Sequence, residues 1–176
     1  MYLAARRLQL RVVDWIQEYD AFPLFGKVGG MPFPSADAAA RARTLRQTVR
    51  FMKSAKTSLI LFAEGELHRP DALLPFGRSL QFIATKVPEA RVIPVAIRHE
   101  LAMHERPEAF MAFGECVPAG ERLAERTRLE IAALLDRLKA RTLLEPESFQ
   151  TLLAGTPDVN ERWDMRRILN RRPAPP

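Results

Sequence analysis

The residues best able to carry chemistry stand immediately after a short apolar run, Ser58–Phe62. Such a run bounded by a turn signal is typical of a fully buried strand, and Gly65 permits a turn at its end. In an open α/β sheet, ligands bind just outside the carboxyl ends of the strands. The sequence therefore predicts a ligand site here, although an exposed charged loop is the simpler interpretation. The polar residues that follow the run are Glu64, Glu66, His68, Arg69 and Asp71.

The elements that must position these residues alternate between helix and strand. Ser35 is a plausible cap for a helix that runs to about Lys53, with apolar residues spaced by three and four. After Ser58–Phe62, the pattern predicts a helix over Ser79–Lys86 and a second buried strand over Arg91–Arg98, with Pro94 inside it. This alternation predicts an α/β fold, a sheet flanked by helices.

The remaining chain predicts further elements at both ends. Leu3–Leu10 is a candidate helix and Arg11–Gln17 a candidate strand, because its β-branched residues favour strands. Arg122–Lys139 has the apolar stripe of a helix. We expect a single α/β domain over residues 1–155 and a basic helix and tail over 156–176, which Thr156 and Pro157 begin. A short helix closed by Gly155 is predicted around Phe149, Leu152 and Leu153.

Composition narrows the class of protein. The 176 residues are 47% hydrophobic and 27% charged, with a net charge of +6, which is typical of one globular domain with a basic surface. A lone cysteine, Cys116, cannot form an internal disulfide, so we expect a reducing, cytoplasmic location. We expect no spanning helix, no leader peptide and no metal site, because no apolar run is long enough, charges interrupt Met1–Leu10 and ligand residues do not cluster.

Three segments also resemble a known family. Phe62-Ala63-Glu64-Gly65, followed by Pro75-Phe76-Gly77-Arg78, is similar to a block of the glycerolipid acyltransferases, the 1-acylglycerol-3-phosphate acyltransferase-like family. That block reads Phe-Pro-Glu-Gly-Thr-Arg-Ser and ends in Pro-Phe-Lys. Val92–Ile97 resembles the family's next strand, and Phe22–Phe33 its preceding block, although Pro34-Ser35 replaces an Asp-Arg pair.

The resemblance implies a fatty acyl transfer from acyl-CoA or acyl-ACP, as co-substrate, to a glycerol-phosphate or lipid hydroxyl. It places substrate contacts at Glu64 and Gly65 and phosphate contacts at Arg69 and Arg78, with no bound cofactor. Arginine suits phosphate because it binds two oxygens at once. Glu66, where the family has threonine, opposes an ordinary glycerol-phosphate acceptor. The implied partners include an anionic membrane surface, so a peripheral position at the inner face is a further expectation. Nucleic acid is disfavoured because no recognition motif is present.

The family's catalytic base is missing from the sequence. The family uses His-x-x-x-x-Asp, and neither His68, His99 nor His104 is followed by aspartate five residues later. Three interpretations stay open: an N-terminally truncated acyltransferase, a non-catalytic lipid or phosphate-binding module on the same fold, or an enzyme with another base. His68 is the catalytic candidate in the third case, because it alone follows the predicted strand.

Overall fold

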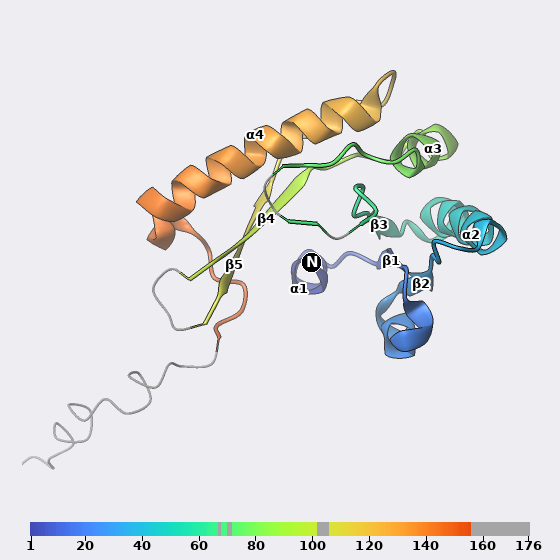
Figure 1. Cartoon of the computed structure of the whole chain (residues 1–176), viewed down its shortest axis with the longest axis horizontal. Coiled ribbons are helices and arrows are strands. Elements are labelled where there is room, and N and C mark those ends of the chain that lie inside the picture. Colours follow the sequence, from blue (N-terminus) through green and yellow to red (C-terminus); the bar gives the residue numbers. More distant parts are fainter. Residues whose placement is uncertain (67, 70–71, 102–105, 156–176) are drawn as a thin grey trace, which may run out of the picture.

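The computed structural model describes residues 1–66, 68–69, 72–101 and 106–155, and within them the chain forms two sheets with helices around them (Figure 1). The predicted α/β class is therefore confirmed. The predicted helix after Thr156 lies outside the described residues. The first element is α1, Tyr2–Arg7, which is shorter than the predicted helix over Leu3–Leu10.

The first sheet is parallel and has β1, Val12–Ile16, at its centre. β2, Gly30–Pro32, and β3, Ser58–Ile60, pair with its two edges. Parallel neighbours need a crossover between them. The 3-10 turns η1, Tyr19–Ala21, and η2, Pro23–Val28, make the first crossover, and helix α2, Ala38–Ala55, makes the second.

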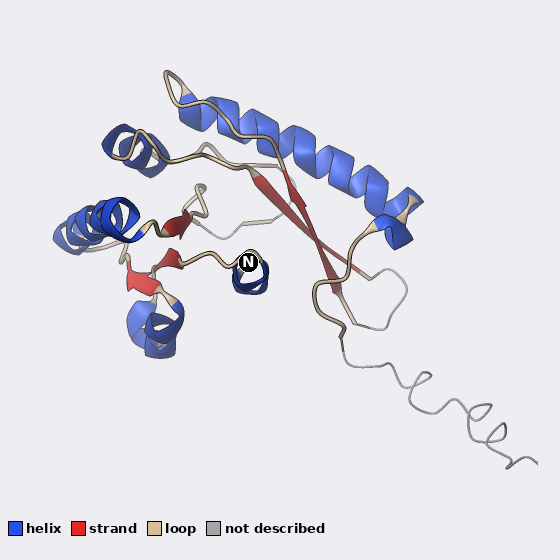
Figure 2. Cartoon of the chain, turned by 180° about the vertical axis from the view of Figure 1, so that it is seen from behind, coloured by secondary structure: helices blue, strands red, loops and turns tan. Residues whose placement is uncertain are grey.

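The second sheet is an antiparallel hairpin. β4, Val95–Glu100, pairs with β5, Glu108–Phe113, which the sequence patterns did not predict. Helix α4, Leu123–Leu144, lies along the hairpin (Figure 2). Helix α3, Ser79–Lys86, lies near the N-terminal part of α4. Leu134 and Leu138 of α4 pack with Ala96 of β4 in one core cluster. A second cluster holds Ala84, Val117 and Leu123.

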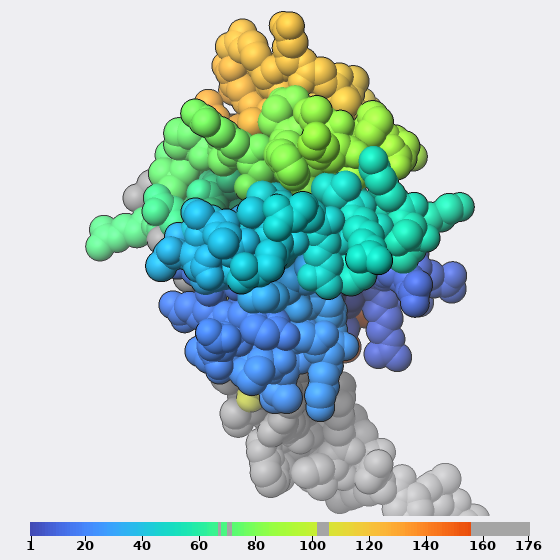
Figure 3. Space-filling view, turned by 90° about the vertical axis from the view of Figure 1, so that its right-hand side faces the viewer, coloured from blue at the N-terminus to red at the C-terminus, as the bar shows by residue number. Residues whose placement is uncertain are grey.

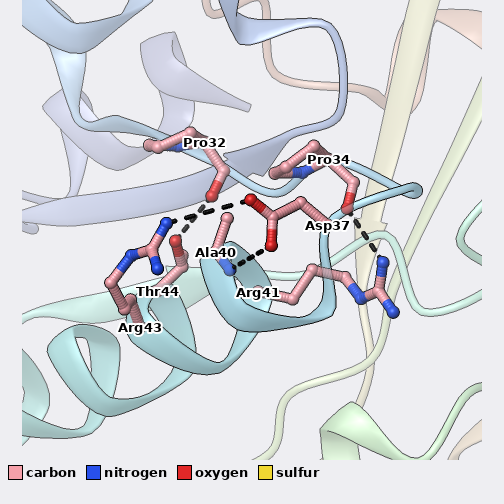
Figure 4. Close-up of polar contacts among 7 residues, drawn as sticks. All are labelled: Pro32, Pro34, Asp37, Ala40, Arg41, Arg43 and Thr44. Atoms are coloured by element: carbon pink, nitrogen blue, oxygen red, sulfur yellow. Dashed lines mark hydrogen bonds and ion pairs between the residues drawn. The ribbon is translucent and has the colours of Figure 1, made fainter.

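Polar contacts tie α2 to the parallel sheet. Thr44 and Thr48 are buried on one face of the helix, and the Thr44 hydroxyl donates to the Pro32 carbonyl at 2.5 Å (Figure 4). The indole N–H of Trp15 donates to the Thr48 hydroxyl at 3.0 Å. The helix is capped by Asp37, whose carboxylate accepts from the Ala40 amide at 2.8 Å, so the prediction of Ser35 as cap was wrong. Asp37 lies two residues after Ser35, directly before the first helical residue, and satisfies a free amide of the first turn.

Three other expectations about elements were also wrong. The strand predicted over Ser58–Phe62 ends at Ile60 and is half-buried, and Phe62 is 65% exposed. Pro94 precedes β4 rather than lying inside it, because proline has no amide hydrogen for the strand ladder. No helix runs from Phe149 to Leu153: the 3-10 turn η3, Pro146–Ser148, ends just before Phe149. The Phe149 ring packs on Phe110 with centroids 4.9 Å apart, and Leu153 is exposed.

The core under α4 should dominate stability. Leu138 is 2% exposed, and truncating such a side chain to alanine leaves a cavity that typically costs about 2–5 kcal/mol. We expect Leu138→Ala to lower the free energy of unfolding by that amount in urea denaturation. Leu143→Ala on the same helix should change it by less than about 0.5 kcal/mol, because that side chain is exposed. Equal losses of unfolding free energy in the two variants would contradict the packing of Leu138 in this core.

Candidate functional site

The loop after β3 is closed at its base by two hydrogen bonds. The Gly77 amide donates to the Ala63 carbonyl at 2.9 Å, and the Leu74 amide donates to the Glu64 carboxylate at 2.7 Å. Gly65 has φ +78°, a conformation that glycine adopts without the penalty of a side chain. These contacts bring the two ends of the predicted site together in space, so Glu64 and Gly77 belong to one compact loop.

His68 is bound at both ring nitrogens. Nδ1 lies 2.6 Å from the Arg69 carbonyl and Nε2 lies 3.0 Å from Glu64 Oε1. A carbonyl and a carboxylate only accept hydrogen bonds, so both contacts are satisfied together only when the ring is protonated and both nitrogens donate. The Arg69 carbonyl first, and then Glu64, raise the pKa of His68 above its usual value. A general-base role would require one of these two contacts to break, because an imidazolium has no lone pair to accept a proton.

The two predicted phosphate ligands stand apart from this contact. Arg69 and Arg78 are exposed, and within the described residues neither guanidinium makes a hydrogen bond or ion pair with Glu64 or His68. Arg78 directly follows Gly77 and directly precedes α3. Both cations are thus accessible at the loop, while Glu64 is engaged with Leu74 and His68.

An apolar cavity of about 380 Å³ lies beside this loop, between the parallel sheet and the hairpin. Phe62, Ala63 and Phe76 of the loop region line it, so the cavity and the polar loop share a border. Its other walls come from the helices α1, α2, α3 and α4, from the strands β1, β3, β4 and β5, and from the segment before β4. Its apolar lining residues elsewhere include Leu8, Leu10, Met52, Leu59, Ile60, Leu80, Ile83, Ile93, Val95, Phe113 and Ile131.

Polar residues of the cavity wall are few, and sequence reasoning missed two of them. Arg91 lines the cavity and is itself exposed. Thr127 is 4% exposed, and its hydroxyl has no hydrogen-bond partner among the described residues. Arg91 was read only as the start of a strand, and Thr127 only as part of an amphipathic helix. A buried polar atom without a partner is costly, so the Thr127 hydroxyl is an unsatisfied group just behind the cavity wall.

A buried carboxylate lies on the same face of β1 as one wall of the cavity. Val12 lines the cavity, and Asp14, two residues further on, points to that same face of the strand. Asp14 is 5% exposed, and its Oδ1 has no hydrogen-bond partner among the described residues. Burial, together with the neighbouring Asp14, raises the pKa of the Tyr2 hydroxyl. This pair places polar groups beneath an otherwise apolar surface.

Comparison with known proteins adds no assignment: no family model, no curated protein and no solved structure matches the chain. Within the described part of the chain, no group of three or more histidine, cysteine, aspartate or glutamate residues is arranged to hold a metal ion. No helix in that part is both long and apolar enough to cross a membrane. The candidate site is therefore defined by the loop and the cavity alone.

The contact between His68 and Glu64 should depend on pH. Because the folded-state pKa of His68 is raised, the contact stabilises the loop fully below the unfolded value of about 6.5 and is lost as pH rises through the folded value. We expect nuclear magnetic resonance titration to give a His68 pKa above the ordinary value of about 6.5. Glu64→Gln should lower the His68 pKa, because the neutral amide removes the carboxylate that favours the charged ring. A His68 titration that does not respond to Glu64→Gln would contradict the contact.

Proposed function

We propose that this chain is the lipid-binding part of a glycerolipid acyltransferase, which holds an acyl chain in the cavity and a phosphate at the adjoining basic loop. The observation that carries the proposal is the shared border between the two surfaces. Phe62, Ala63 and Phe76 line an apolar cavity, and Glu64 and Arg78 lie within two residues of them. An amphipathic molecule with an apolar tail and an anionic head fits such a border.

The apolar part of the ligand is the larger source of affinity. Each buried methylene contributes about 0.8 kcal/mol, and the cavity wall is almost entirely hydrocarbon. The anionic head would meet Arg69, Arg78 and Arg91, which are exposed cations beside or within the cavity wall.

Acyl transfer also requires a base that this arrangement does not supply. The acceptor hydroxyl attacks the thioester carbonyl carbon, the carbon–sulfur bond breaks, and the hydroxyl proton must pass to a base on its way to the departing thiolate. In the described residues, both ring nitrogens of His68 face hydrogen-bond acceptors, the Arg69 carbonyl and the Glu64 carboxylate. We therefore propose binding without efficient turnover for these 176 residues. The alternative is a module that binds lipid and never catalyses. The contacts at both ring nitrogens of His68 favour that alternative as well.

Filling the cavity should weaken binding of an acyl chain. Ala4 and Ala90 both line the cavity, and leucine at either position would displace about two methylenes of ligand. We expect Ala4→Leu and Ala90→Leu each to raise the Kd for a fluorescent fatty acid by at least about tenfold. Ala140→Leu, on the exposed face of α4, is the matched control and should leave the Kd unchanged. Unchanged binding in both cavity variants would refute the acyl-chain site.

A turnover assay separates the enzyme from the non-catalytic module. The chain should bind acyl-CoA but release little free thiol when a lysophospholipid acceptor is added. An N-terminal extension carrying His-x-x-x-x-Asp should restore thiol release in the enzyme interpretation. An extended protein that binds acyl-CoA and still releases no thiol would leave the binding module as the correct interpretation. Turnover by the 176 residues that His68→Gln abolishes would instead identify His68 as the base.

A further inference from the structure

We propose that η2 and the outward face of α2 form a docking surface for an anionic membrane, with the η2 side chains inserted between lipids and the α2 cations against headgroups. This docking face is defined by Phe22, Leu24, Phe25 and Val28 around η2 and by Arg43, Arg46, Arg50 and Lys53 on α2. The proposal is independent of the cavity and of any reaction, because it concerns a surface that neither uses.

The apolar half of the docking face is unusually exposed. Leu24 is 71% exposed, Phe22 54% and Val28 51%. They lie in or next to a single 3-10 segment, and the Phe22 ring packs edge-on against Phe25 with centroids 6.0 Å apart. Scattered single apolar residues on a surface need no explanation, but a cluster of large ones marks an interaction site.

The basic half comes from one face of α2. Arg43, Arg46, Arg50 and Lys53 follow one another at spacings of three and four, so their side chains share one side of the helix. All four are exposed, while Thr44 and Thr48 are buried against the sheet. The helix contains neither aspartate nor glutamate, and Arg43 is the only one of the four with an ion pair in the described structure, to Asp37.

The two halves belong to one side of the molecule. Both η2 and α2 contact β2, and the space-filling view shows the blue surface of residues near 25 directly beneath the cyan surface of α2 (Figure 3). Lys27, in the middle of η2, adds a cation to the apolar half. Exposed acids also occur beside the apolar half, at Glu18 and Asp20, so the cations of the docking face come mainly from α2.

This combination favours a membrane over the other possible occupants. Apolar side chains that enter the interface and cations that meet anionic headgroups are the two contributions that hold a peripheral protein on a bilayer. Nucleic acid would use the cations but has no general need for the exposed Leu24 and Val28. A symmetric second copy would cover the apolar residues, but it would bring the uncompensated cations of two α2 helices toward each other.

Vesicle co-sedimentation tests the docking face with the whole chain. Wild type should bind phosphatidylglycerol-rich vesicles, bind phosphatidylcholine vesicles far more weakly, and be released by salt. The double variant Arg46→Gln/Arg50→Gln should bind the anionic vesicles about 25-fold more weakly, at about fivefold for each cation. Leu24→Ser should weaken binding about tenfold, because most of an exposed leucine no longer enters the bilayer.

Matched controls on α4 separate the docking face from general charge and hydrophobicity. Arg137→Gln/Lys139→Gln removes the same charge from exposed positions, and Leu143→Ser removes a leucine that is 67% exposed. Both should bind vesicles like wild type. Equal losses in the test and control variants would overturn the proposal. It would also be overturned by binding to duplex DNA in place of vesicles, or by a dimer that Leu24→Ser dissociates while vesicle binding stays absent.

Discussion

The arrangement depends on how β3 is paired. This strand pairs with β1 along one edge, and the next strand of the chain, β4, pairs with β5 in a separate hairpin. The apolar side chains between them therefore face each other without a shared ladder of backbone hydrogen bonds. Phe62 and Leu59 border the resulting cavity, and Ile93 and Val95 border it from the other side. A continuous sheet would have placed these residues in a filled core.

The same constraint gives the polar loop its position. Because β3 ends at Ile60, the chain turns at Gly65 on the rim of the cavity rather than on the far side of a closed sheet. The Gly77–Ala63 and Leu74–Glu64 hydrogen bonds then close the base of the loop beside the cavity-lining residues Phe62 and Ala63. The apolar cavity and the exposed cations of the loop are therefore neighbours because of how the strands pair. The side chains of the loop do not determine its position.

Much of the element order could be predicted from the sequence, but the pairing of the elements could not. The spacing of apolar residues located α2, α3 and α4, and β-branched residues located β1. The apolar run at Ser58–Phe62 predicted burial because its composition cannot distinguish a core strand from the wall of a cavity. β5 was missed, since Glu108–Phe113 alternates weakly and follows no hairpin turn signal. Arg91 and Thr127 acquire a role only through the fold, because no local pattern connects an arginine after α3 with a threonine on α4.

The separation of the two sheets has a consequence for cooperativity. The packing beneath α4 and the polar contacts between α2 and the parallel sheet belong to different walls of one apolar cavity. Regions with few shared contacts open independently, so each sheet can exchange its amide hydrogens in a separate event. A molecule in the cavity touches both walls and favours only the state in which both are folded. Occupancy would then merge two local openings into one global unfolding, so a molecule bound there would act as a structural component of this domain.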